Sequence, residues 1–406
     1  MHLLNRSITI GSLRIPLPVF AWFFLAILAA IAEISRGQEA INNYYIFKGV
    51  FEHTLAQKNL YLQYPGEYLD SNHYGPLFSI LIAPFALLPV WLGCFLWCLA
   101  NAWVLFYAIR QLELSKKQEL LILLIGLVEM MTAIHNVQFN PMLTGWILLS
   151  YVLVEKEKDG WAALCIMAGF FIKLYGIVGM AFFLFSKHKL RFLLSLVFWG
   201  VVLFCLPMLL SSPEFIIQSY KDWLQSLVQK NAENVNLADE NLMQDISVMG
   251  MIRRMGHVQV KNYFVIGPAA LLYALPVLRT SQYRYATFRM SYLSLLLIGA
   301  VIFSSSAESS TFVLAVTGVA LWYVIQEEPR KKWMNALLLF VILLTSLSAT
   351  DLFPPYVRRH IILPYSLKAL PCFTAWCVIV YQLLRKDFAG TVLPAGTATQ
   401  TQELQK

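Results

Sequence analysis

Charged side chains are scarce in this sequence. Asp, Glu, Lys and Arg make up 13% of its 406 residues, whereas they form about a quarter of a typical soluble domain. Apolar residues supply 58% of the chain and recur in runs along its whole length. A soluble core of this length has no use for so much apolar surface. The composition therefore indicates an all-α integral membrane protein, in which lipid surrounds the helices.

The sequence also lacks the short motifs of several enzyme classes. Its six cysteines include no Cys-x-x-Cys pair and no zinc-ligand spacing. No P-loop, no Gly-x-Gly-x-x-Gly between a strand and a helix, no Gly-x-Ser-x-Gly and no His-Glu-x-x-His occurs, so cytosolic nucleotide chemistry is not indicated. The net charge of +8 comes from short basic clusters between apolar runs. Nucleic-acid binding would favour a single basic stripe, so we expect no nucleic-acid partner.

Apolar runs of roughly 20 residues predict the helices that cross the membrane. We expect ten to twelve crossings in one membrane domain, residues 1–386, with spans near the following positions: 15–34, 90–109, 120–135, 141–155, 161–172, 174–186, 191–210, 262–278, 290–305, 310–326, 333–350 and 366–384. Lys and Arg cluster on one side of these spans, which places that side and both termini in the cytoplasm of a plasma (inner) membrane protein. The polar segment 387–406 is expected to be a disordered cytoplasmic tail.

Three loops fall on the outer side of this topology: residues 35–89, 211–261 and 351–362. In the first, the short, proline-bounded apolar stretch 76–89 is expected to form an interfacial helix. The same loop contains Glu67, Asp70 and His73. A carboxylate is a common base when a hydroxyl attacks, and the spacing of Asp70 and His73 would let them share a helix face. The alternative is a solvated loop whose polar residues serve caps and turns.

Other polar groups interrupt apolar runs. Gln138 and Asn140 lie between two expected spans, where amides can bond sugar hydroxyls or complete a helix turn. Lys173 lies inside AALCIMAGFFIKLYGIVGMAFFLF with no acidic residue nearby in sequence. Its ammonium needs a partner, and a lipid phosphate would serve. Snorkelling of Lys173 to the outer headgroups is the alternative.

Three more charged residues occur on the outer side. Arg253 and Arg254 could bind a phosphate, although adjacent arginines on a loop are commonly just solvated. Glu308, in SSSAESSTFV, could be a second catalytic or sugar-binding group, or a helix start signal.

Motifs in the first loop resemble a known family. The run from NNYYIFKGVF through KNLYLQYP to NHYGPLFSILIAPFALLP resembles polytopic glycosyltransferases of family 87, the DUF2029 type. Tyr61 matches the tyrosine of the family's Gly-x-x-x-Tyr element. Tyr74 begins the match to its Tyr-x-Pro-Pro-Leu element, which continues through Gly75, Pro76 and Leu77.

The resemblance continues along most of the chain. VQFNPMLTGWILL is similar to the family's Gly-Gln-x-Asn segment through Gln138 and Asn140, and AGFFIKLYG to a helix-pair segment that contains Lys173. MQDISVMGMIRRM is similar to its outer Ser-x-x-Gly segment through Ser247 and Gly250.

The resemblance implies a GT-C fold and a membrane hexosyltransferase. Such enzymes take a sugar, commonly mannose, from a polyprenyl-phosphate carrier at the outer face and usually invert the anomeric centre. The implied partners are a lipid-linked sugar donor, a glycolipid or glycan acceptor, and membrane lipid. No cofactor is implied beyond the donor itself, no metal ligands are assigned, and a metal requirement is left open.

The first loop departs from the family at its early aspartate, which aligns with Asn43 or Asn42. An amide cannot act as a base, so Asp70 is the expected base and Glu67 the second candidate. Lys173, with Arg253 or Arg254, is expected to hold the donor phosphate. The complete set of expected substrate-binding residues is Asn42, Asn43, Tyr61, His73, Tyr74, Gln138, Asn140, Lys173, Arg253, Arg254 and Glu308.

Two other functions are compatible with the pattern. A transporter or flippase of a lipid-linked or polar substrate would need charged groups near the bilayer midplane and a route to both sides, whereas most polar groups here gather at one face. A non-catalytic relative is motivated by the amide at Asn43.

Overall fold

The computed structural model describes residues 6–236 and 243–389. The chain divides into two compact units, and the four divisions each fall within a helix. The first unit comprises Met1–Trp22, Ile109–Thr132 and Asn234–Lys406, and the second comprises Phe23–Ala108 and Ala133–Glu233. Most of the tail expected at 387–406 lies outside the described residues.

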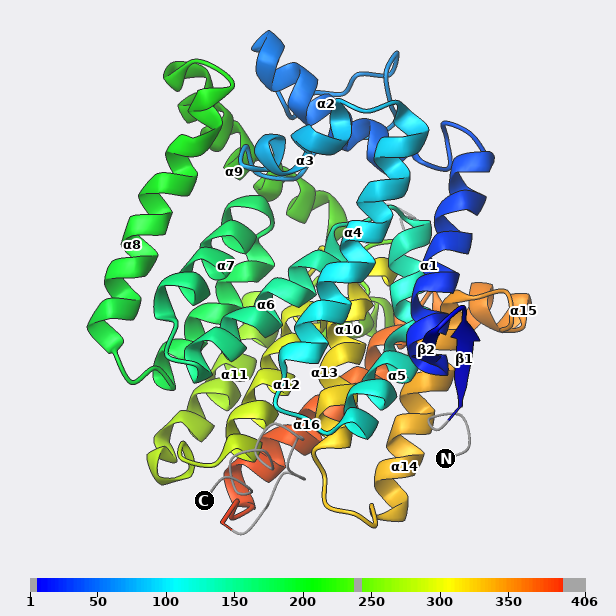
Figure 1. The fold of residues 1–406 in the computed structure, drawn as a ribbon, viewed down its shortest axis with the longest axis vertical. Helices are drawn as coiled ribbons and strands as arrows, with labels where there is room; N and C mark the ends of the chain where they lie inside the picture. Colours follow the sequence, from blue (N-terminus) through cyan, green and yellow to red (C-terminus); the bar gives the residue numbers. More distant parts are fainter. Residues whose placement is uncertain (1–5, 237–242, 390–406) are drawn as a thin grey trace. The chain divides into compact units, whose positions relative to one another are not determined.

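The second unit is built from helices. In chain order they are α1 (Leu17–Ser35), α2 (Asn42–Ala56), α3 (Phe78–Ala86), α4 (Val90–Gln111), the end of α5 (Lys116–His135), α6 (Asn140–Glu155), α7 (Asp159–Ile172), a 3₁₀ helix (Leu174–Leu184), α8 (Lys189–Cys205), a 3₁₀ turn (Leu206–Leu209) and α9 (Pro213–Asn234). Within this unit α7 packs against α6, α8 and the 3₁₀ helix, and α2 packs against α3 (Figure 1).

Aromatic side chains form the core beneath α2 and α3. Phe47, Phe78, Trp97 and Phe139 are fully buried. The ring of Tyr74 stacks on that of Phe78 with centroids 4.7 Å apart, and Phe47 meets Tyr74 edge-on at 5.1 Å. Paired rings of this geometry add specific contacts to the burial of their large apolar area. The core therefore fixes both Tyr74 and the turn that contains Phe139.

The first unit begins with a β-hairpin and continues as helices. Strand β1 (Ser7–Ile10) pairs antiparallel with β2 (Leu13–Pro16), and Gly11 takes a φ of +60° at the turn. The longer helices are α10 (Val248–Gly256), α11 (Tyr263–Ala274), α12 (Ala286–Ile302), α13 (Phe312–Val324), α14 (Lys332–Phe340) and α16 (Leu370–Arg385), with the short α15 (Pro355–Val357) between the last two. α12 packs against α13 and α16, and nearly all of its residues are buried, as expected of a helix that is apolar on every side.

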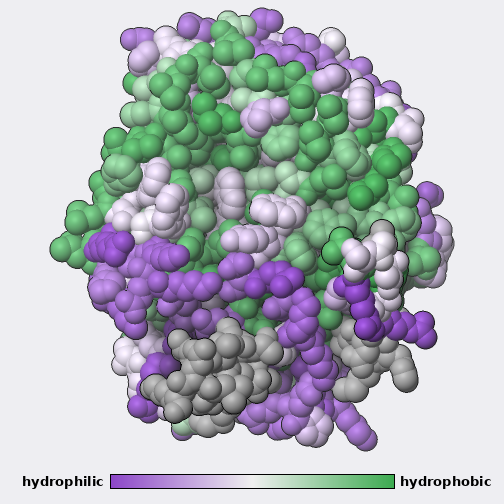
Figure 2. All heavy atoms as spheres, in the orientation of Figure 1, coloured by the Kyte–Doolittle hydropathy of each residue, from purple (hydrophilic) through white to green (hydrophobic). Residues whose placement is uncertain are grey.

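Several helices are suited to cross a membrane. Among the described residues, six are both long and apolar enough: Leu17–Ser35, Val90–Gln111, Lys116–His135, Lys189–Leu209, Lys332–Ala349 and Leu367–Arg385. α8 leaves Leu194, Val197, Phe198 and Val201 exposed, each by more than half. Figure 2 shows apolar side chains over a broad area of the face it draws. A large apolar surface of this kind needs lipid around it. The chain is an all-α membrane protein, which confirms the fold class expected from composition.

Local structure corrects several expectations. The first long helix begins at Leu17 rather than residue 15, because β2 takes up the residues before it. The expected span 174–186 is a 3₁₀ helix, Leu174–Leu184, that follows extended backbone at Lys173. The outer segment 211–261, read as a loop from its polar residues, contains α9 and α10. α9 forms because Ile216, Tyr220 and Trp223 recur at helical spacing and pack together.

Candidate functional site

Four of the expected site residues lie together in the second unit. The Tyr74 hydroxyl donates to Gln138 Oε1 at 2.9 Å, and Lys173 Nζ donates to Asn140 Oδ1 at 2.8 Å. Lys173 Nζ also lies over the Tyr74 ring, 5.4 Å from its centroid. Three separate segments supply these side chains, so folding converts separate sequence motifs into one polar cluster. We call Tyr74, Gln138, Asn140 and Lys173 the polar cluster.

The turn between α5 and α6 places the two amides. Val137 takes a φ of +52°, and Trp97 Nε1 donates to its carbonyl at 3.1 Å. α6 then begins at Asn140 with Pro141 in its first turn, where a missing N–H costs nothing. Asn140 is fully buried and Gln138 nearly so. The turn is therefore held by the aromatic core, and its amides face inward.

A glycine brings Tyr74 and Lys173 together. The Gly75 N–H donates to the carbonyl of Ile172 at 3.0 Å. A Cβ at Gly75 would lie 2.0 Å from the backbone oxygen of Phe171, so a side chain there would push the loop away from the end of α7. Lys173 follows directly as the C-cap of α7, with extended backbone and a half-buried side chain.

A cavity of about 450 Å³ lies beside the loop 57–77 in the same unit. The expected base Asp70 lines it, as do Tyr61 and His73. The Asp70 side chain is 54% exposed and lies 3.9 Å from Lys230 Nζ of α9. Asp70 and His73 do not share a helix face, because this loop is not helical and Asp70 takes a φ of +68°. They meet at the cavity instead.

Burial and nearby charges set the protonation of His73 at the cavity. The pKa of His73 is lowered from 6.5 to about 4, first by burial and then by the positive charges of Lys230 and Lys173, while Asp70 and Glu233 act in the opposite direction. His73 is therefore neutral at pH 7. Its Nδ1 lies 3.1 Å from the Ser226 hydroxyl. Lys173 of the polar cluster is the weakest of these influences on the pKa of His73.

The second candidate base, Glu67, is engaged elsewhere. Its carboxylate lies 2.8 Å from His53 Nε2, and the ring of His53 packs against Tyr64 with centroids 4.1 Å apart. Glu67 is absent from the wall of the cavity, which Asp70 lines. The two candidate carboxylates thus point to different surroundings, and the geometry favours Asp70.

The side chains of Asn42 and Asn43 hydrogen-bond to backbone groups of other segments. Asn42 donates to the carbonyl of Leu69 and accepts from its N–H, both at 2.8 Å, which fixes the loop one residue before Asp70. Asn43 donates to the carbonyl of Asn136 at 2.8 Å, next to the turn that contains Gln138. Tyr61 also acts through backbone, since its hydroxyl donates to the carbonyl of Tyr74 at 3.2 Å.

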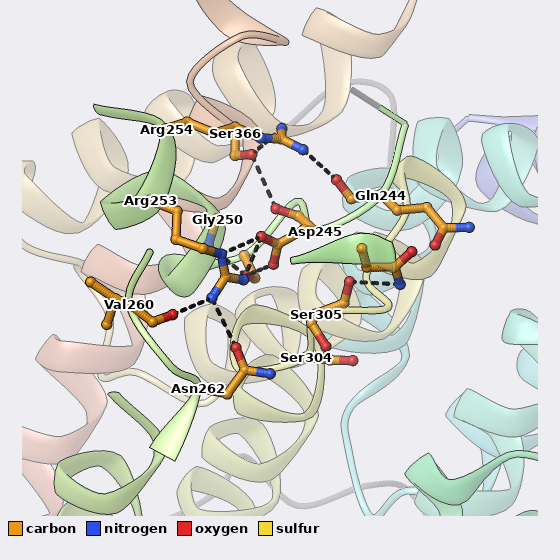
Figure 3. A network of polar contacts seen from close by, with 12 residues as sticks. Gln244, Asp245, Gly250, Arg253, Arg254, Val260, Asn262, Ser304, Ser305 and Ser366 are labelled. Atoms are coloured by element: carbon orange, nitrogen blue, oxygen red, sulfur yellow. Dashed lines mark hydrogen bonds and ion pairs between the residues drawn. The ribbon is translucent and has the colours of Figure 1, made fainter. Parts of the chain in front are cut away.

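Arg253 and Arg254 lie in the first unit, in the network drawn in Figure 3. Arg253 is buried and donates to Asp245 Oδ2 at 3.1 Å through Nε, to the carbonyl of Val260 at 3.0 Å and to Asn262 at 2.9 Å. Arg254 donates to the Ser366 hydroxyl and to the carbonyl of Gln244. Neither arginine is a solvated loop residue, and both bind side chains and carbonyls of the protein itself.

The Ser-x-x-Gly segment caps a helix. Ser247 is the N-cap of α10, and its hydroxyl accepts from the Gly250 N–H at 3.0 Å. A Cβ at Gly250 would lie 1.9 Å from the carbonyl oxygen of Asp245, so the turn requires glycine. Glu308 serves in the same way, since it forms a capping box with Thr311, the helix-start alternative for this residue.

One wall of the cavity was not predicted from the sequence. α9 contributes six polar residues to it: Asp222, Gln225, Ser226, Gln229, Lys230 and Glu233. Their spacing of three or four residues was a signal for a polar helix face within the segment assigned as a loop. A buried carboxylate was also missed: Glu33 of α1 lies 2.6 Å from His135 Nδ1 and 2.9 Å from Arg36. Among the described residues, no group of three His, Cys, Asp or Glu side chains is placed to hold a metal ion.

Comparison with known proteins gives the chain's class. The family model for glycosyltransferase family 87 matches residues 72–305. The chain belongs to this family, as its motifs indicated, and is a membrane glycosyltransferase. The matched segment contains the polar cluster, His73 and α9, whereas Asp70 and Glu67 precede it. No curated protein matches the chain.

Proposed function

We propose that the protein transfers a hexose, with mannose favoured, from a polyprenyl-phosphate carrier to a glycolipid or glycan acceptor at the outer face of the membrane. The observation that supports this most is the convergence of the polar cluster, which includes a half-buried lysine, beside a cavity lined by carboxylates. A lipid-linked donor fits a helical membrane protein because its chain can stay in the bilayer while its phosphate reaches the ends of the helices.

Lys173 is the proposed phosphate contact. It lies at the junction of α7 and the 3₁₀ helix, where the extended backbone sets its side chain beside Asn140 and Tyr74. Negative charge builds up on the phosphate as the bond to the sugar breaks. An ammonium held in place by its neighbours stabilises that charge more in the transition state than in the ground state.

Asp70 is the proposed base, in a single displacement with inversion. The acceptor hydroxyl oxygen attacks the anomeric carbon, Asp70 takes the hydroxyl proton, and the polyprenyl phosphate leaves with the electron pair of the broken bond. Lys230, 3.9 Å away, balances the Asp70 charge without displacing it from the cavity wall. His73 is neutral at pH 7 and can exchange hydrogen bonds with a sugar there.

The proposed topology is that of a multi-pass protein of the plasma (inner) membrane with a GT-C arrangement, one membrane domain over residues 1–386 and both termini in the cytoplasm. The basic clusters between the apolar segments support this orientation. It puts Asp70, Lys173 and α9 together on the outer side.

The decisive experiment measures transfer of radiolabelled mannose from polyprenyl-phosphomannose in membranes that contain the chain. We expect transfer by the wild type and a loss of about 100- to 1,000-fold in Lys173→Ala and in Asp70→Asn. Lys187→Ala is the matched control, because Lys187 is 71% exposed and pairs only on the surface with Glu157. Unchanged thermal unfolding of each variant separates chemistry from folding.

Each assignment has its own contrary result. Transfer retained in Lys173→Ala removes the phosphate role, and transfer retained in Asp70→Asn removes the base. No transfer by the wild type from any polyprenyl-phosphate sugar contradicts the donor class.

A further inference from the structure

The cavity beside α9 has two walls of different origin. The loop 57–77 supplies one, and the other is the polar face of α9 that runs from Asp222 to Glu233. The volume of the cavity, about 450 Å³, falls within the range of about 300–1,000 Å³ that is usual for small-molecule sites. Most of the lining side chains are polar, so the cavity is suited to a hydrated, hydrogen-bonding ligand rather than to a lipid chain.

The charges on the wall exclude a phosphate. Asp70, Asp222 and Glu233 contribute three carboxylates, against the single ammonium of Lys230. Lys230 is shared between Asp70 at 3.9 Å and Glu233 at 3.8 Å. An anionic ligand would meet an excess of like charge at close range. The donor phosphate therefore belongs at Lys173, outside this wall, and the cavity is left for the other substrate.

Two amides on the wall are available to a ligand. Among the described residues, the side chains of Gln63 and Gln225 have no hydrogen-bond partner within the protein, and both are exposed. One lies on the loop and the other on α9, so they face the cavity from its two walls. A primary amide both donates and accepts, which matches the paired donor and acceptor character of sugar hydroxyls.

The two walls are fixed to one another. Trp223 Nε1 donates to the carbonyl of His73 at 2.9 Å, and Asn59 donates to Asp222 at 2.9 Å. Trp223 is itself buried with Ile216 and Tyr220. A ligand that bridges the loop and α9 therefore finds the separation already set, which lowers the entropy lost on binding.

We infer that this cavity binds the acceptor as an uncharged, hydroxyl-rich sugar, and that Gln63 and Gln225 recognise its hydroxyls from opposite walls. That this sugar is the acceptor rests on the proposed function. Whatever the reaction, the cavity between the loop 57–77 and α9 binds neutral sugars in preference to anionic sugars.

Direct binding tests the site without any donor. The purified wild-type protein in lipid nanodiscs, free of sugar-based detergent, is examined by saturation-transfer NMR with methyl α-D-mannopyranoside, methyl β-D-glucopyranoside and methyl β-D-glucuronide. We expect binding of at least one neutral glycoside and weaker binding of the glucuronide. The double variant Gln63→Ala/Gln225→Ala should lower the affinity for the neutral glycoside about tenfold, equivalent to about 1.4 kcal/mol. Lys221→Ala, an exposed change on α9 outside the cavity wall, should leave it unchanged.

Transfer kinetics then separate the two proposals. In the double variant we expect KM for the acceptor to rise about tenfold, with KM for the donor unchanged. Wild-type transfer with an unaltered acceptor KM in the double variant overturns the inference and leaves the proposed function standing. Glycoside binding that depends on Gln63 and Gln225 without any transfer sustains the site and contradicts the function. Failure of the wild type to bind any neutral glycoside, or equal binding of the glucuronide, also overturns the inference.

Discussion

Lys173 and Arg253 show how two cations with the same expected role differ in their surroundings. Lys173 is half-buried beside two aromatic rings and an amide. Arg253 is 0% exposed, and its guanidinium is held by the carboxylate of Asp245, a backbone carbonyl and the amide of Asn262. A buried charge of this kind organises its own loop, because its removal leaves the partner carboxylate uncompensated.

Replacing Arg253 by alanine should therefore destabilise the protein rather than weaken donor binding. The variant leaves Asp245 buried without its partner, for which a cost of about 3–5 kcal/mol is typical. The measurement is the midpoint of thermal unfolding of purified protein. Arg358→Ala is the control, since Arg358 pairs with the fully exposed Asp351, and surface pairs contribute about 0–1 kcal/mol.

The alternative for Arg253 gives the opposite pattern. If its guanidinium bound the donor phosphate, Arg253→Ala would unfold at the wild-type temperature and raise KM for the donor. That result would return Arg253 to the set of substrate contacts.

Single residues differ in how far the sequence could place them. Gln138, Asn140 and Lys173 could be predicted because each interrupts an apolar run, and Tyr74 because it begins a family motif. Lys230 was missed, because it lies 160 positions from Asp70 and nothing local marks their proximity. The left-handed backbone of Asp70 was equally hidden, since loops of Asp, Ser and Asn admit many conformations.

At the scale of elements, the site depends on how closely a loop approaches a helix end. Gly75 lets the loop bond the carbonyl of Ile172, and this contact sets Tyr74 beside Lys173. The motif Tyr-Gly-Pro therefore serves the packing of the loop against α7 as well as the polar cluster. The tyrosine enters the cluster, the glycine permits contact, and Pro76 leads into α3.

Gly75→Ala should disturb both stability and activity. Its Cβ would lie 2.0 Å from the backbone oxygen of Phe171, and overpacking of this kind costs about 1–3 kcal/mol. A shift of the loop by about 1 Å can lower a rate about 100-fold. Gly66→Ala is a matched control on the same loop, because nothing lies within 4 Å of its Cβ position. Thermal unfolding and sugar transfer are measured for both variants. Equal behaviour of the two would show that the close approach is unimportant.

Elements were predictable where hydropathy alone decides. The long apolar helices α4 and α8 begin and end near the expected positions, because length and composition determine a span. The 3₁₀ helix Leu174–Leu184 was not, since its departure from α geometry begins at the extended Lys173 and follows packing rather than composition. The long α9 and the short α10 were not predicted, because they lie in a polar segment whose apolar residues form only one narrow stripe.

For the whole molecule, hydropathy and charge are the two terms that set orientation in a membrane. The apolar helices indicate which segments enter lipid, and the basic clusters between them favour the proposed orientation. In the proposed orientation Lys187 and Lys189 are on the cytoplasmic side, and the loop 57–77 with Asp70 is on the outer side. The proposed use of a lipid-linked donor at the outer face therefore requires this topology.

Labelling of introduced cysteines tests that topology directly. Lys58→Cys, in the loop before Asp70, and Lys187→Cys, between the 3₁₀ helix and α8, are both exposed positions in the second unit. A membrane-impermeant maleimide added to intact cells should label Lys58→Cys strongly and leave Lys187→Cys at the level of the wild-type chain, whose own cysteines provide the background. Permeabilised cells should label both. Labelling of Lys187→Cys alone in intact cells would invert the orientation and move Asp70 to the cytoplasmic side. Such an inversion would be incompatible with transfer at the outer face, even if every contact within the second unit were correct.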